Sequence, residues 1–229
     1  MNEILSSEVF LLTLTLGTYL IAVWLYRKTG FKLLHPMLLS MAVIISFLKL
    51  TDIDYETYRD GTAVIELMLG LSVVCLGLLL YEQIDIIKGN LLTISVSVFT
   101  VCIIGIGSVV LIAKYMGVTE DIITSIQPKS VTTPIALSIS KNSVGIESLT
   151  ALVVVYTGIF GSIAGPVILR TIRVKNRIAK GLAMDSAAHA VGTAEAVKMG
   201  ATEGAVSGLA IGIMGIFTAI LIPVLQTIF

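Results

Sequence analysis

The stretch LLTISVSVFTVCIIGIGSVVLIA, Leu91–Ala113, is apolar and contains no charged residue. A helix of about 20 apolar residues crosses the roughly 30 Å hydrocarbon core of a bilayer, so this stretch predicts a membrane span. Five further apolar runs come close to the same length: Val9–Tyr26, Leu33–Leu48, Thr62–Tyr81, Ser148–Leu169 and Gly204–Phe229. We therefore expect an all-α membrane protein with about six transmembrane helices.

Composition leads to the same fold class. Of the 229 residues, 56% are hydrophobic and 13% are charged, about half the charged share of a soluble domain. The net charge is zero, which gives no indication of a nucleic-acid partner. Cys75 and Cys102 lie in apolar runs without metal-ligand spacing, so we expect packed thiols and neither a metal nor a cofactor. The acidic N-terminus lacks the basic leader of a signal peptide, so the first run is expected to stay as a span.

Orientation follows from the basic residues, which mark cytoplasmic loops. Arg27 and Lys28 follow the first run, and the basic residues of 170–180 follow the fifth. The acidic loop TDIDYETYRD occupies 51–60 and is expected outside the cell, as are both termini. Counting crossings then leaves 122–140 to enter and leave the membrane on one side, as a re-entrant hairpin.

Two stretches are too polar for lipid-facing helices and too apolar for ordinary loops. The first, 122–140, carries KSVTT between Pro128 and Pro134. The second, 181–198, carries charged residues and a histidine among small residues. We expect both to form re-entrant, broken-helix hairpins.

The C-terminal half also contains an internal repeat. The letters GIF recur at 158–160 and 215–217, with a later proline at Pro166 and Pro223, and each copy follows one of the polar stretches. Hairpins entering from opposite sides would form an inverted repeat, which is how many secondary transporters build a solute site. The expected organisation is one polytopic membrane domain over 1–229, with four spans in 1–115 and two hairpin-plus-span units in 116–229.

The first polar stretch offers groups that bind carboxylates. Lys129 supplies a cation, and Ser130, Thr132 and Thr133 supply hydroxyls. A helix restarting at Pro134 or the next residue would add free N–H groups at its positive end. The alternative is that the hydroxyls only cap helices and hold neighbouring helices together.

The second polar stretch offers titratable groups. Ser186, His189 and Thr193 would share one face of a continuous helix, and Asp185 lies one turn before His189. Gly192 indicates a break or a close backbone approach. The alternative is a structural histidine that is buried and hydrogen-bonded by the aspartate.

Proton coupling has three candidates, His189, Asp185 and Glu66 of the third run. His189 titrates near neutral pH in its ordinary state, whereas Glu66 has the alternative of reaching water at the outer end of its span. Zinc-protease, phosphate-loop and nucleophile-elbow motifs are absent from the sequence, so we expect no enzyme. A hydrolase that pairs Ser186 or Ser130 with His189 is a distant alternative.

Several motifs together resemble the LrgB/CidB family of bacterial membrane proteins over essentially the whole chain. They are PKSVTTPIA at 128–136, GI at 145–146, TGIFGSIAGP at 157–166, GLAMDSAAHAVGTAEA at 181–196 and EGAVSGLA at 203–210. The chain departs from the family at Leu71 and Leu79, where prolines are usual, and at Asp185, where glycine is usual. The pairing of Asp185 with His189 is therefore not implied by the resemblance.

The resemblance implies a multi-pass protein of the bacterial cell membrane that works with a smaller LrgA/CidA-like membrane partner. It also implies one of two functions. The first, which we favour, is transport of small monocarboxylate anions such as pyruvate, lactate or glycolate, as in a related plastid glycolate/glycerate carrier. The alternative is holin-like or antiholin-like control of murein hydrolase activity and autolysis. We further expect a homo-oligomer in the lipid bilayer, with a dimer favoured.

Overall fold

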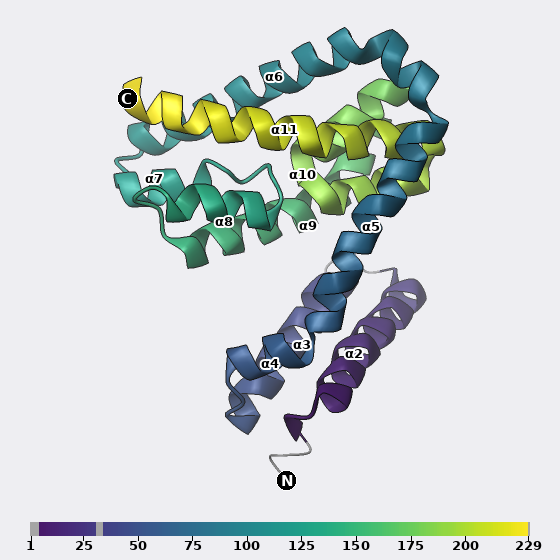
Figure 1. Ribbon diagram of the computed structural model, residues 1–229, viewed down its shortest axis with the longest axis vertical. Coiled ribbons are helices and arrows are strands. Elements are labelled where there is room, and N and C mark those ends of the chain that lie inside the picture. The colour runs from purple at the N-terminus through teal and green to yellow at the C-terminus, as the bar shows by residue number, and fades with distance from the viewer. Residues whose placement is uncertain (1–4, 31–33, 229) are drawn as a thin grey trace. The chain divides into compact units, whose positions relative to one another are not determined.

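The computed structural model describes residues 5–30 and 34–228, apart from several side chains in 66–80 and those of 227 and 228. Every regular element in these residues is a helix (Figure 1), which confirms the all-α class. The chain packs as two units, Met1–Cys75 and Leu76–Phe229, divided within α5 (Ala63–Glu82).

The first unit is built from α2 (Glu8–Thr29), α3 (Pro36–Thr51), α4 (Tyr55–Gly61) and the start of α5. α3 begins at Pro36, whose fixed φ suits a first helical turn, so this helix starts later than the predicted run. The short α4 occupies the acidic loop. A Cβ on Gly61 would lie 2.7 Å from Leu11 Cδ1, which shows that the glycine lets α4 approach α2 closely.

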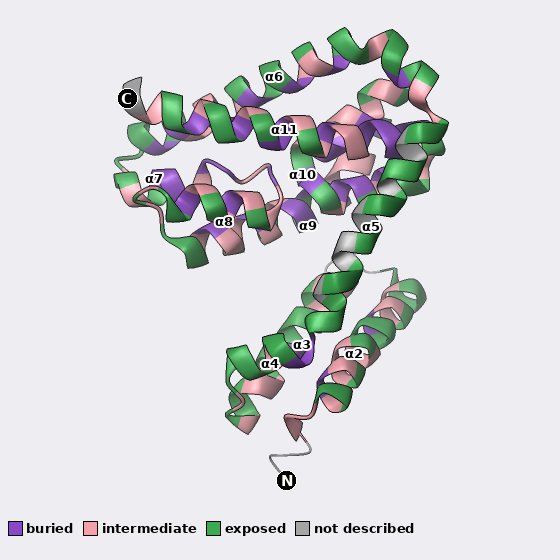
Figure 2. Cartoon of the chain, viewed as in Figure 1, coloured by how far each residue is buried: buried purple, intermediate pink, exposed green. Residues whose placement is uncertain are grey.

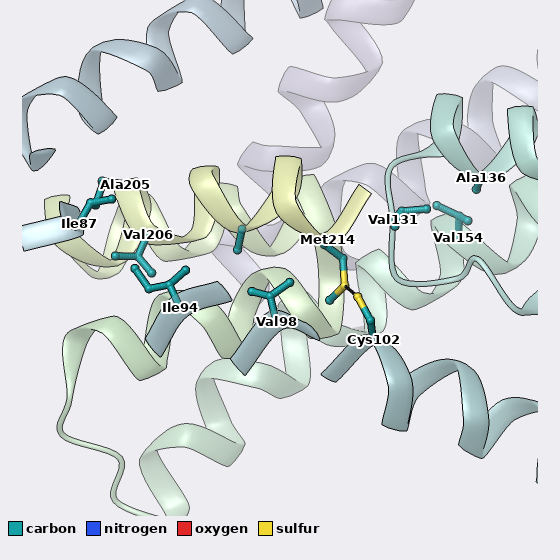
Figure 3. Packing of buried hydrophobic residues seen from close by; sticks show 11 residues of the cluster. Ile87, Ile94, Val98, Cys102, Val131, Ala136, Val154, Ala205, Val206 and Met214 are labelled. Carbon is teal, nitrogen blue, oxygen red and sulfur yellow. Dashed lines mark hydrogen bonds between the residues drawn. The ribbon is translucent and has the colours of Figure 1, made fainter. Parts of the chain in front are cut away.

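The second unit contains three long helices, α6 (Ile84–Tyr115), α9 (Glu147–Thr171) and α11 (Ala201–Ile228), with the shorter α7 (Glu120–Ile126), α8 (Thr133–Lys141) and the interrupted α10 (Arg177–Met199). Its largest buried cluster joins Val98 and Cys102 of α6 to Val206 and Met214 of α11 (Figure 3). These side chains are small or unbranched, so the long helices approach closely.

Four helices of the described residues are long and apolar enough to cross a membrane: α2, α6, α9 and α11. Their outward side chains are apolar, with Leu92 and Leu111 of α6 79% and 67% exposed, and exposed residues line much of these helices (Figure 2). A multi-pass membrane protein is therefore confirmed. The count of six spans stays a prediction, because α3 has only 16 residues and α5 includes side chains that are not described.

The first polar stretch folds as a hairpin whose arms are α7 and α8. The Ile146 N–H, beyond α8, donates a hydrogen bond of 2.7 Å to Ser125 Oγ in α7. The two ends of the hairpin therefore lie together. The Thr150 hydroxyl of α9 donates to Ser140 Oγ of α8 at 2.9 Å. The arms are joined by residues 127–132, in which the Lys129 N–H donates to the Ile126 carbonyl and the Val131 N–H donates to the Pro128 carbonyl in tight turns before Thr132 becomes extended.

The second polar stretch also folds as a hairpin, although its backbone hydrogen bonds assign all of it to the single helix α10. Ala188 (φ −146°, ψ 15°) and His189 (φ 42°, ψ −134°) leave the helical conformation. In a continuous helix Met184 and Gly192 would lie about 12 Å apart along the axis, yet a Cβ on Gly192 would overlap the Met184 carbonyl. The chain therefore folds back sharply at Ala188 and His189.

This break overturns the expected helical face. Because it lies between Ser186 and His189, the three residues Ser186, His189 and Thr193 do not share the face of one continuous helix. Gly192 does not mark the break itself. It allows the close backbone approach that was the other interpretation of this glycine.

The comparison of glycine with alanine at position 189 tests the break. A backbone such as that of His189 suits glycine and costs other residues about 1–3 kcal/mol. Both variants lose the imidazole ring, so we expect His189→Gly to exceed His189→Ala in stability by about 1 kcal/mol. The measurement is thermal unfolding of the detergent-purified protein.

A regular helical position supplies the control for this comparison. Ala194→Gly should lower stability, because glycine inside a helix costs about 0.5–1 kcal/mol relative to alanine. If His189→Ala proves more stable than His189→Gly, the helix is continuous at position 189 and the hairpin is wrong.

Candidate functional site

The loop of the first hairpin, 127–132, places its cation beside a hydroxyl. Lys129 Nζ donates a hydrogen bond of 3.3 Å to Ser130 Oγ, and both side chains are half-buried. α8 begins at Thr133, with Thr132 at the N-cap in an extended conformation (φ −65°, ψ 150°) and without a side-chain capping bond. The predicted restart at Pro134 thus occurs one residue earlier, and both threonine hydroxyls lie at the positive end of α8.

One wall of this loop borders a narrow cavity of about 10 Å³, which holds about one water molecule. Its polar lining comes from Gln127 and Ser130 of the loop, Cys102 of α6 and Thr218 of α11. Cys102 Sγ lies 2.8 Å from the Met214 sulfur (Figure 3) and 3.8 Å from Thr218 Oγ1. Of the four residues predicted from the first stretch, Ser130 lines this cavity.

A wide cavity of about 210 Å³ lies on the other side of Gln127. Its polar lining comprises Lys114, Glu120, Thr124, Gln127 and Gln226. The Gln226 Nε2 group donates a long hydrogen bond of 3.5 Å to Gln127 Oε1. Gln127 therefore borders both cavities and is itself 6% exposed.

The break of the second hairpin rests on glycines of α9. His189 Nε2 lies 3.0 Å from the Val154 carbonyl oxygen, and because a carbonyl only accepts, Nε2 carries the proton. A Cβ on Gly158 would lie 2.7 Å from the imidazole ring, and one on Gly161 would lie 2.7 Å from Ala188 Cβ. These contacts explain the glycines of TGIFGSIAG.

Asp185 is the most unusual group near this break. It is 1% exposed, and both of its carboxyl oxygens, like His189 Nδ1, are buried without a hydrogen-bond partner. The expected pairing of Asp185 with His189 is therefore wrong, since the ring bonds to Val154 instead. An ionised carboxylate in such a place costs several kcal/mol, so this group requires a proton or a ligand.

The remaining candidates have other surroundings. Thr193 Oγ1 lies 2.8 Å from Ser207 Oγ of α11 in a buried pair, and Ser186 is half-buried. Glu203 is only 5% exposed and lies against Gly200. The side chain of Glu66 lies outside the described residues.

The sequence analysis missed Gln127, Thr218 and Cys102 as cavity residues. Gln127 carried a signal, because it is an amide directly before the first proline of the polar loop. Thr218 and Cys102 gave little indication of a cavity, since single hydroxyls and thiols are common in apolar helices and mostly bond within them.

The chain matches the model of the LrgB-like family over residues 15–228. It is 32% identical to the "Antiholin-like protein LrgB" of Bacillus subtilis (strain 168), over 95% of both chains. It is 34% identical to the "Holin-like protein CidB" of Staphylococcus aureus (strain N315), over the full length of both. No solved structure gives a significant match. The identity extends over essentially the whole length of these relatives, and the chain belongs to the LrgB family.

Proposed function

We propose that this protein carries small monocarboxylates, such as pyruvate, lactate or glycolate, across the bacterial cell membrane. The observation that supports it is that two interrupted hairpins carry polar groups into the interior of the second unit. The first contributes Gln127 and Ser130 to the narrow cavity, and the second buries the unpartnered Asp185 carboxyl. Secondary transporters build solute sites from such discontinuous helices.

The chemistry of the first hairpin favours an anion. Lys129 already donates to Ser130 and would exchange this hydroxyl for a solute carboxylate. The hydroxyls of Thr132 and Thr133 lie at the N-terminus of α8, where backbone N–H groups and the helix dipole attract negative charge. No carboxylate is among the residues that line the narrow cavity.

For the membrane arrangement we propose that both hairpins are re-entrant and enter from opposite sides, with both termini outside. The contact between Ile146 and Ser125 supports this for the first hairpin, because its two ends lie together. The Asp121 carboxylate near the start of α7 also supports the re-entrant arrangement of the first hairpin. The Thr119 hydroxyl donates to the Asp121 carboxylate and holds the pKa of that carboxyl below its usual range, which suits the aqueous end of α7.

Asp185 is the residue we propose to take up the coupling proton, with His189 beside it. On the elements packed around α10, the other buried titratable groups of the described residues are the Cys102 thiol of α6 and Glu203 of α11, whereas Asp85, Lys88 and Lys114 of α6 are exposed. The charged residues of α9, Glu147 and Arg170, are exposed. Glu66 stays a further candidate.

A second candidate function comes from the names of the relatives, which are holin-like and antiholin-like. On that proposal the chain regulates murein hydrolase activity and autolysis without specific solute transport. Either function fits a complex with a small LrgA/CidA-like membrane protein and a homodimer of this chain, both of which we propose.

Cysteine labelling tests the first hairpin. In a protein carrying Cys75→Ser and Cys102→Ser, we expect Thr119→Cys and Val144→Cys to react with an impermeant maleimide from the same side of the membrane. Both positions are exposed, so neither substitution disturbs packing. Lys175→Cys should react from the opposite side. Labelling of positions 119 and 144 from opposite sides would show that 122–140 crosses the membrane.

Uptake by liposomes tests the transported solute. The purified protein, with or without its small partner, should accumulate labelled pyruvate or glycolate saturably. Lys129→Met should abolish uptake at normal expression, and Lys129→Arg should retain more activity than Lys129→Gln, because it keeps the charge. Unselective leakage of unrelated solutes of similar size would argue for the second candidate function. Normal uptake by Lys129→Met would show that Lys129 does not bind the solute.

The proton site has its own readout in the same liposomes. Uptake by the parent protein should change across about pH 5 to 8, the range in which a histidine site titrates. Asp185→Asn removes the titrating carboxyl at nearly constant volume, so it should keep solute exchange but lose accumulation driven by a proton gradient. His189→Gln should flatten the pH profile as well. Profiles equal to the parent's in both variants, at matched protein amounts, would remove these residues from the coupling.

A further inference from the structure

We propose that Gln127 and Gln226 form a gate between the wide cavity, which is the vestibule through which a solute arrives, and the narrow cavity, which is its closed binding chamber. The proposal rests on the proposed transport function for the identity of the solute, but the gate itself is a property of the two cavities. It assigns a role to two glutamines that lie far apart in the sequence and meet at the end of α7.

The sizes of the cavities are the first observation. The wide cavity measures about 210 Å³, whereas the narrow one measures about 10 Å³. A monocarboxylate with three carbons is several times larger than the single water that the narrow cavity admits. A solute therefore fits the vestibule as it stands, and it enters the chamber only if a wall moves.

Gln127 is the wall that divides the two spaces, since it lines both. Its backbone is fixed, because its N–H donates to the Ile123 carbonyl at 3.0 Å in the last turn of α7. Its side-chain oxygen accepts a hydrogen bond from Gln226 at 3.5 Å, which is long for an amide pair. A rotation of the side chain thus opens the chamber at little cost while α7 stays in place.

Gln226 lies on a segment that is suited to release this contact. It follows Pro223, which lies inside α11 and removes one backbone hydrogen bond from the helix. The last turns of α11 are therefore free to tilt relative to the part that carries Met214 and Thr218. A tilt there separates Gln226 from Gln127 and leaves the chamber lining intact.

The chamber lining suits the carboxylate end of a solute. Ser130 and Thr218 offer hydroxyl donors, and Gln127 offers an amide donor. Once the gate opens, the Gln127 amide is freed from Gln226 and its N–H groups turn to the solute. In this arrangement Gln127 both closes the chamber and contributes to binding, while Gln226 is a positioning residue that contacts no solute inside it.

Cys102 provides a native reporter for the gate, because its thiol lines the narrow cavity. In the Cys75→Ser protein, reconstituted in liposomes, the probe is the small anionic reagent methanethiosulfonate ethylsulfonate, and the rate of Cys102 labelling is measured by mass spectrometry. The parent should react slowly. Gln127→Ala and Gln226→Ala should each react about fivefold faster, the factor for losing one neutral hydrogen bond that keeps the gate closed.

Gln83→Ala is the matched control. It removes a glutamine of the same unit whose amide oxygen accepts from Thr202 at 3.1 Å, away from both cavities, so it should label at the parent rate. Gln226 is half-buried near the end of α11, so the Gln226→Ala variant tests the gate even if Gln127→Ala folds poorly. Parent-like labelling rates in Gln226→Ala and in folded Gln127→Ala overturn the gate.

Labelling in the presence of solute distinguishes failure of the gate from failure of the proposed transport function. Saturating pyruvate or glycolate should slow the labelling of Cys102 in the Gln226→Ala protein, because the solute occupies the chamber. Fast labelling that neither solute slows supports the gate and rejects the monocarboxylate. Saturable uptake together with parent-like labelling of the variants rejects the gate and leaves the transport function standing.

Discussion

The packing of the α10 break against the glycines of α9 is the contact on which the second hairpin depends. Backbone that leaves the helical conformation inside a bilayer is tolerated only when it is enclosed by protein or lines a cavity. Gly158 and Gly161 leave the space that the His189 ring and the Ala188 methyl occupy. A side chain at either glycine would push the break away from α9.

The same enclosure accounts for the position of the polar groups. With the break packed against α9, His189 Nε2 donates to the Val154 carbonyl and Thr193 pairs with Ser207, so both hairpin side chains bond to neighbouring helices. His189 Nδ1 and both carboxyl oxygens of Asp185 remain without a partner. A buried carboxyl without a partner indicates a site that is completed by a proton or a ligand.

The two hairpins interrupt the helical backbone in different ways. The first uses two prolines, which remove backbone donors from the connection between α7 and α8, while the second uses a two-residue break. The first brings Gln127 and Ser130 to the narrow cavity, and the second buries Asp185, His189 and Thr193. A chamber that admits about one water suits an occluded carrier better than an open pore. The names of the relatives, holin-like and antiholin-like, belong to the second proposed function.

The class of protein, the long apolar helices and the two polar stretches could all be predicted from the amino-acid sequence, because hydropathy and proline act on neighbouring residues along the chain. It also placed the start of α8 to within one residue. The tertiary structure decided the partners: His189 with Val154 rather than Asp185, a break at Ala188 rather than Gly192, and a cavity wall made by Gln127 and Thr218. Each of these depends on which segments, distant in the chain, come to lie against one another. A single apolar sequence does not specify such contacts, since one small or hydroxylated residue in a membrane helix packs equally well against many neighbours.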